Sequence, residues 1–174
     1  MLNIYLHKGD SMKKSSERLD ALDRQILNEL QHNSAITNVE LAQRIMLSPP
    51  AVHGRIKRLE ERGYIRSYVA LLDREKIGYD LLCIVSVTLR SHETQLIQAF
   101  REAIGKLPEV LECFFLTGDH DFLLKIIVRN HKELESFLTE KLTPIPGVGH
   151  ISTGVVLAEL KNTTVLALDN IEMG

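Results

Sequence analysis

The front part of the chain repeats apolar residues with the period of amphipathic helices. Apolar side chains recur three and four positions apart from Leu19 to Leu30, which predicts a first helix that ends near Asn33. Asp20 suits the N-cap of this helix, because a short acidic side chain accepts hydrogen bonds from backbone N–H groups that have no partner in the helix.

Two further helices are predicted from their terminal signals. Thr37 and Glu40 have the spacing of a capping box, so a second helix begins at Thr37. Ser48 followed by Pro49 marks the start of a third, because proline at the first helical position loses no hydrogen bond. Gly63 marks its end, since glycine adopts the left-handed conformation that closes a helix.

The third helix, expected over about residues 49–62, has one apolar side and one small and basic side. The residues expected to face outward are Pro50, Ala51, Gly54, Lys57 and Arg58. Slim residues let the backbone approach base edges in the DNA major groove, and cations reach phosphates. A basic run alone is more often a solvated surface helix, but the three-helix order favours a helix-turn-helix DNA reader. Further contacts to DNA are expected from Ser48, Arg55 and Arg62.

The rest of the chain alternates strands and helices. Residues 64–72 are rich in β-forming side chains and predict a strand, and residues 73–80 predict a linker. The elements expected after the linker are strand 81–89, helix 93–106, strands 110–116 and 122–128, helix 131–142, strand 151–160 and a possible strand over 163–168. This order is the split βαβ pattern, so we predict an α+β protein whose C-terminal βαββαβ domain is ferredoxin-like, with both helices on one face of the sheet.

The other face of that sheet is expected to be uncovered. We place four apolar residues of the first strand on it: Leu81, Cys83, Val85 and Val87. Exposed apolar surface of this kind indicates association between copies of the chain.

Charge is divided between the two halves. The chain has a formal net charge of -2, but residues 13–76 hold 12 Lys and Arg against 9 Asp and Glu, whereas residues 107–174 hold 5 against 10. A basic front and an acidic back suit a protein that meets a polyanion with one end. The two cysteines, Cys83 and Cys113, lack metal-site or redox-motif spacing and are interpreted as reduced, buried thiols.

These patterns predict five segments. They are an N-terminal extension over 1–18, expected to be disordered, a helix-turn-helix domain over 19–64, a connecting strand and linker over 65–80, a second domain over 81–168 and a C-terminal tail over 169–174. No apolar run approaches the roughly 20 residues that span a bilayer, so we expect a cytoplasmic protein with no membrane partner.

The front half resembles the Lrp/AsnC family of transcriptional regulators in the runs LDALDRQIL, ELAQRIMLSPPAVHGRIKRLEERGYI and YVALLDREKIGYD. The second half resembles the family's RAM (regulation of amino acid metabolism) domain. The resemblance implies a winged-helix-like reader of double-stranded DNA that forms dimers and larger even-numbered assemblies, among them octamers. It also implies an amino acid as effector, with no cofactor or metal.

The turn over residues 117–121 is the candidate effector site. Considered alone, such a turn is usually a hairpin loop whose aspartate accepts backbone hydrogen bonds. The resemblance implies that this loop lines a pocket between dimers, and a hydroxyl of the last strand matches it as well. The candidate effector-binding residues are Gly118, Asp119, His120, Asp121 and Thr153. Ile151 stands where the family more often has threonine or serine.

Two alternatives to an effector-controlled regulator are considered. The first is an enzyme, since split βαβ domains also support catalysis. No phosphate loop, nucleophile elbow or metal-ligand cluster is present in the sequence, and His120 between two aspartates is the only acid-base grouping, so we expect no enzyme. The second is a chromosome-organising DNA-binding protein without an effector, which only ligand titration distinguishes.

Overall fold

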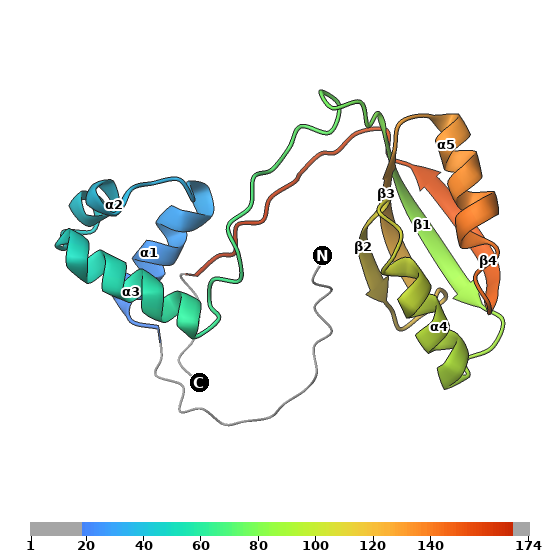
Figure 1. Cartoon of the computed structure of the whole chain (residues 1–174), viewed down its shortest axis with the longest axis horizontal. Coiled ribbons are helices and arrows are strands. Elements are labelled where there is room, and N and C mark those ends of the chain that lie inside the picture. The colour runs from blue at the N-terminus through green and yellow to red at the C-terminus, as the bar shows by residue number, and fades with distance from the viewer. Residues whose placement is uncertain (1–18, 169–174) are drawn as a thin grey trace. The chain divides into compact units, whose positions relative to one another are not determined.

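The computed structural model describes residues 19–168. The predicted N-terminal extension and C-terminal tail lie outside the described residues. Those that are described form two compact units, residues 72–160 and residues 19–71 together with 161–168 (Figure 1). Within this part of the chain, no helix has the length and apolar character needed to cross a membrane.

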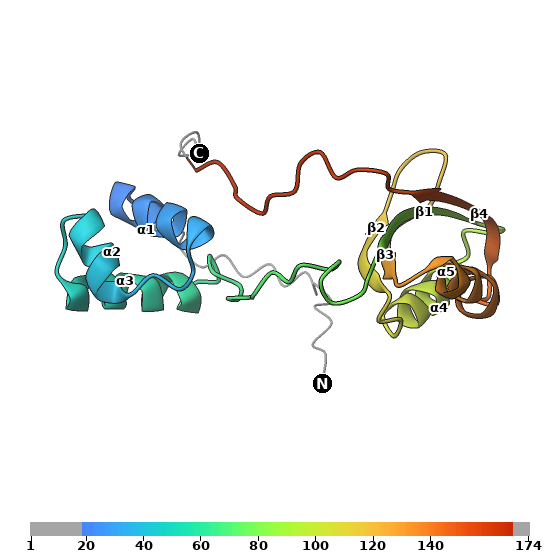
Figure 2. The same cartoon turned by 90° about the horizontal axis from the view of Figure 1, so that it is seen from above.

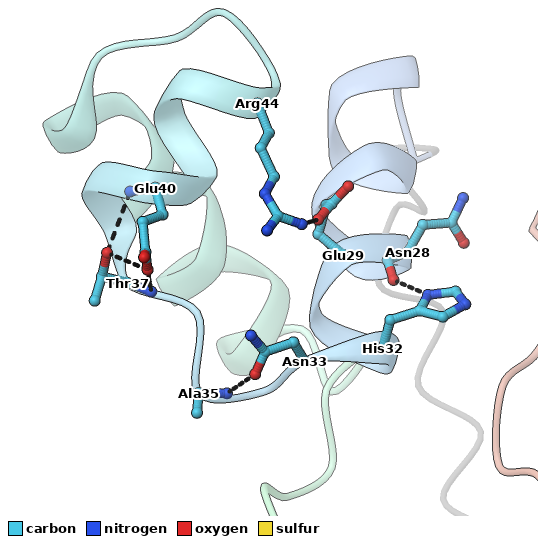
Figure 3. Close-up of polar contacts among 8 residues, drawn as sticks. All are labelled: Asn28, Glu29, His32, Asn33, Ala35, Thr37, Glu40 and Arg44. Atoms are coloured by element: carbon cyan, nitrogen blue, oxygen red, sulfur yellow. Dashed lines mark hydrogen bonds and ion pairs between the residues drawn. The ribbon is translucent and has the colours of Figure 1, made fainter.

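The three predicted helices of the first unit are confirmed. They are α1 (Ala21–His32), α2 (Asn38–Arg44) and α3 (Pro49–Glu61). The Asp20 carboxylate caps α1 by accepting from the Asp23 N–H at 2.7 Å. The capping box of α2 is complete, with Thr37 and Glu40 each bonding the other's backbone (Figure 3).

The helices pack through a small core and one ion pair. Ile26, Leu41, Val52 and Leu59 are fully buried between them. Glu29 of α1 pairs with Arg44 of α2 at 2.5 Å (Figure 3). Each of the three helices therefore contributes to one interior.

Left-handed residues end α2 and α3. After α2, Met46 has φ 57°, and the N–H of Leu47 donates to the Ala42 carbonyl. Gly63 ends α3 in the same way, with φ 76°. Both are Schellman motifs, in which the N–H beyond the left-handed residue satisfies a carbonyl of the last turn. The prediction for Gly63 is confirmed.

The prediction of a strand over residues 64–72 is wrong for the single chain, because these residues have no regular structure. A strand needs a partner backbone, and no described segment pairs with this one. Val69, Leu71 and Leu72 are largely exposed. The possible strand over 163–168 is also absent, and that segment instead contacts α1.

The second unit has the predicted βαββαβ order. Its elements are β1 (Leu81–Leu89), α4 (Thr94–Ile104), β2 (Val110–Phe115), β3 (Phe122–Val128), α5 (His131–Ser136) continued by the π-helical turn η1 (Phe137–Leu142), and β4 (Val148–Val155). The antiparallel sheet has the order β2-β3-β1-β4. Figures 1 and 2 show α4 and α5 on the same face of this sheet, as predicted.

The prediction for the uncovered sheet face placed the wrong residues there. Cys83, Val85 and Val87 are fully buried under the helices, with Leu81 packed beside them. Side chains alternate along a strand, so the opposite face carries the other set of β1 residues. That set is Leu82, Ile84, Ser86 and Thr88, of which Leu82 is buried and the other three are partly exposed. Because every early position of β1 is apolar, the sequence pattern does not distinguish the two faces.

Apolar residues are still present on the uncovered face. Register places Leu123 of β3 beside Ser86, and Phe114 of β2 beside Leu123. Phe114 is exposed. Of the two thiols predicted to be buried, Cys83 is buried, but Cys113 on the edge strand β2 is exposed.

Candidate DNA interface and ligand site

The outward side of α3 carries most of the residues predicted to contact DNA. The exposed ones are Ser48, Pro50, Ala51, Gly54, Lys57 and Arg58. Ser48 occupies the N-cap position, yet its side chain makes no capping hydrogen bond. A Cβ added at Gly54 would meet nothing within 4 Å. Internal packing therefore does not require glycine there, and the small residue leaves room for a partner outside the domain.

His53 also lies on this exposed side and was not among the predicted residues. It follows Pro50 by one helical turn and precedes Lys57 by another, so all three share a face. Helical spacing alone would have found it. An imidazole presents both donor and acceptor nitrogens to base edges.

Arg55 differs from its neighbours on α3. Its Nη1 donates to Asp20 Oδ2 and to Asp23 Oδ1, both at 2.6 Å, and its side chain is 22% exposed. Asp23 is buried, and Arg58 Nη2 lies 3.6 Å from the same Asp23 oxygen. The guanidinium thus fixes α3 against the start of α1.

The charges of this cluster shift two pKa values. Desolvation is the largest influence on Asp20 and acts to raise its pKa, but the bonds from the Asp23 N–H and from Arg55 outweigh it and lower the pKa. The bonds to Asp20 and then Asp23 raise the pKa of Arg55. Asp20 and Arg55 therefore each hold their charge more strongly than the free side chains do.

Arg62, the last predicted DNA contact, is the C-cap residue of α3 and lies over a tyrosine ring. Its guanidinium carbon is 5.1 Å from the ring centroid of Tyr64. A cation at this distance over an aromatic face is attracted by the ring, so the guanidinium of Arg62 is more restricted than that of a freely solvated arginine.

The turn predicted to bind an effector connects β2 and β3. Gly118 has φ 143°, which favours glycine, and a Cβ there would meet nothing within 4 Å. Asp119 is exposed. The backbone of this turn is therefore open to an approaching group.

Asp121 is held from two sides. Its Oδ2 accepts from the backbone N–H of Leu89 at 2.7 Å, and its Oδ1 lies 2.6 Å from His92 Nε2. The carboxylate is nearly buried, whereas the His92 side chain is 68% exposed. His92 is thus the outer neighbour of this carboxylate.

Burial is the largest influence on the Asp121 pKa and raises it, but the Leu89 N–H and His92 together outweigh burial, so the pKa lies below its ordinary value. His120 lowers the Asp121 pKa slightly further, and its Nδ1 lies 3.3 Å from Thr88 Oγ1. His92 and Thr88 were missed by the sequence analysis. The fold brings them to the turn from the end of β1, and no sequence spacing signals that contact.

Thr153 stands apart from this group within one chain. It pairs with Val85 in the middle of β1, whereas Asp121 bonds Leu89 at the strand's end. Among the described residues, no hydrogen bond connects Thr153 with the turn, and no group of three or more His, Cys, Asp or Glu could hold a metal ion.

A helix-turn-helix unit with an exposed cationic helix, joined to a ferredoxin-like domain with a polar turn, defines a DNA-binding regulator with a separate sensing domain. Residues 19–66 match the family model for a winged helix-turn-helix DNA-binding domain, and residues 82–166 match the Lrp/AsnC ligand binding domain. The chain belongs to the Lrp/AsnC family of transcriptional regulators.

Individual relatives agree over nearly the full length. The leucine-responsive regulatory protein of Escherichia coli K12 is 40% identical over 159 residues, which cover 91% of this chain and 97% of the relative. The protein of that name from Haemophilus influenzae is 42% identical over 156 residues, 90% of this chain and 94% of the relative.

Solved structures agree as well. A transcriptional regulator from Neisseria meningitidis, solved as a complex with L-Met, superposes with a TM-score of 0.84 at 38% identity and covers 87% of this chain and 98% of its own. Escherichia coli AsnC gives a TM-score of 0.75 at 26% identity, covering 85% of this chain and 98% of its own.

Proposed function

We propose that this protein is a sequence-specific regulator of transcription that reads double-stranded DNA with α3 and whose DNA affinity or assembly responds to an amino acid. The observation that carries the proposal is the exposed face of α3, where Pro50, His53, Gly54 and Lys57 are all accessible. The proposal includes action in the cytoplasm and no catalytic activity.

The DNA-reading role is tested with Lys57→Ala. The Lys57 side chain is 66% exposed, and its only ion pair among the described residues is a 3.8 Å contact to Glu61, so its removal should leave the fold intact. Losing one phosphate contact should flatten the log-log salt dependence of DNA binding by about 0.9, whereas losing a base contact should relax sequence preference by roughly 1–3 kcal/mol.

Gel-shift titrations at several salt concentrations measure both effects. Lys132→Ala is the matched control, because it removes an exposed cation from α5 in the other unit. If Lys57→Ala and Lys132→Ala both bind as the parent does, α3 does not form the interface.

The proposed effector site is the turn with Gly118, Asp119, His120 and Asp121. Gly118 lets backbone amides approach a carboxylate, and the two aspartates offer partners for an ammonium group. Thr153 would join this site from a neighbouring copy. The L-Met bound to the Neisseria relative supports an amino acid as the class of ligand.

The effector proposal is tested by a thermal-shift screen of the twenty amino acids, followed by calorimetric titration of any hit. Asp119→Asn should weaken binding without unfolding the domain, since Asp119 is exposed. Asp121→Asn is a poorer test, because Asp121 also bonds the backbone of Leu89. Glu159→Gln, an exposed acid beyond β4, is the control.

Gel shifts with and without any amino acid that binds separate the effector-controlled regulator from a DNA-binding protein without an effector. A regulator of this kind should change its DNA affinity about 5–150-fold at saturating ligand, since coupling energies of about 1–3 kcal/mol are typical. A protein that stabilises with none of the amino acids, while still binding DNA, would be the effector-independent chromosome-organising protein instead.

A further inference from the structure

The end of the described chain returns to the first helix. The backbone N–H of Leu166 donates to Gln31 Oε1 at 2.7 Å, and Gln31 Nε2 donates to the Leu166 carbonyl at 3.1 Å. One amide side chain thus satisfies both backbone groups of a residue 135 positions away. Such a pair of hydrogen bonds binds an extended backbone as a neighbouring β-strand would, whichever side chain the bound residue carries.

A leucine next to this pair completes the domain's core. Leu168 is 8% exposed and packs in the same cluster as Ile26, Leu41 and Ala42. By contrast, the side chain of Leu166 is 70% exposed. The segment is therefore held at Leu166 by its backbone and at Leu168 by its side chain.

The surface that receives the segment is formed by α1 and α2. A hollow there is lined by Asn28, Glu29, His32 and Arg44 on one side and by residues 165–168 on the other. The Glu29–Arg44 ion pair that joins α1 to α2 borders it (Figure 3). No residue of α3 lines this hollow, so a docked segment leaves the predicted DNA-reading face accessible.

We propose that residues 161–168 are a docking segment for the DNA-binding domain: the chain's own C-terminal segment completes the helix-turn-helix core at α1, and full DNA affinity requires it to be docked. The segment follows β4, so the polypeptide connects the ligand-binding domain to the DNA-binding domain a second time, in addition to residues 65–80. The effect on DNA affinity rests on the DNA-reading role proposed above, whereas the docking itself, followed by hydrogen exchange, stands or fails separately.

Hydrogen exchange of the full chain, followed peptide by peptide, tests the docking. Leu168→Asp puts a charge into the core and should speed exchange in α1 and α2 by about tenfold or more, because burial of a leucine is worth roughly that factor. Peptides of β1 and β3 should keep the parent's rates. Leu166→Asp is the control, since its side chain is exposed and only its backbone is bound.

A second variant removes the backbone clamp and leaves the core leucines in place. Gln31→Ala should speed exchange of the Leu166 amide and lower DNA affinity in gel shifts in the same direction as Leu168→Asp. Parent-like exchange in α1 and α2 for both variants, or parent-like DNA affinity for both, would overturn the proposal.

A cross-link decides whose segment docks. Asn28 and Ala167 line the same hollow, so a short bifunctional thiol reagent should join Asn28→Cys to Ala167→Cys. Cys113→Ser is included because Cys113 is exposed. A cross-linked single chain on a non-reducing denaturing gel supports docking within one chain, whereas a covalent dimer shows that the segment comes from a second copy and contradicts the assignment.

Discussion

Arg55 and Lys57 are near neighbours on α3, but their surroundings are opposite. Arg55 bonds two carboxylates and is mostly buried, while Lys57 extends into solvent. From the sequence both residues are predicted to contact DNA, because helical spacing shows which face a residue occupies and does not show a partner on another helix. Only the fold brings Asp20 and Asp23 to Arg55.

This difference predicts that one of two matched substitutions lowers stability and the other weakens DNA binding. Arg55→Met should lower the free energy of unfolding by roughly 1–3 kcal/mol, because it leaves the buried Asp23 carboxylate with only the more distant Arg58. Lys57→Met should change it by at most about 0.5 kcal/mol and should weaken DNA binding instead.

Urea titrations followed by circular dichroism measure the stabilities, and gel shifts measure the affinities. If Arg55→Met were as stable as Lys57→Met, the ion-pair cluster would not stabilise the packing of α1 against α3.

At the scale of elements, helix starts were predicted accurately because their signals are local. A capping box or a serine-proline pair acts within one turn of backbone, so Thr37 and Ser48 mark their helices in any context. Strands are different. Residues 64–72 have strand composition without strand structure, since pairing depends on another segment that sequence proximity does not supply.

The two left-handed helix ends allow a paired prediction. Met46→Gly should raise the free energy of unfolding by up to about 1 kcal/mol, because φ 57° is strained for a residue with a Cβ and Met46 is 88% exposed. Gly63→Ala should lower it by a similar amount, since φ is 76° there and alanine resists it.

Thermal unfolding of the two variants beside the parent checks both signs. A Met46→Gly protein that melts below the parent would indicate that the methionine side chain contributes more than the strain it carries.

At the scale of the whole molecule, the uncovered sheet face predicts self-association. The sequence predicts that copies of the chain associate, but the residues predicted to mediate it lie on the wrong face. A strand that is apolar at consecutive positions does not show which alternate residues face the helices. The structure assigns Ile84, Leu123 and Phe114 to that face, and the exposed 64–72 segment offers unpaired backbone as well.

We therefore expect a dimer that assembles into a larger even-numbered particle, an octamer among the possible sizes. Ile84→Glu puts a charge in the middle of the uncovered face and should shift light-scattering masses toward the 19.7 kDa chain. Leu157→Glu, at a residue 98% exposed beyond β4, should assemble as the parent does.

Two-fold symmetry would present α3 helices to half-sites about 34–36 Å apart, or a multiple of that, so the weakly assembling variant should also lose its preference for palindromic DNA. A parent protein that scatters as a single chain at micromolar concentration would contradict both expectations, because one short helix alone is too small a contact to read an operator.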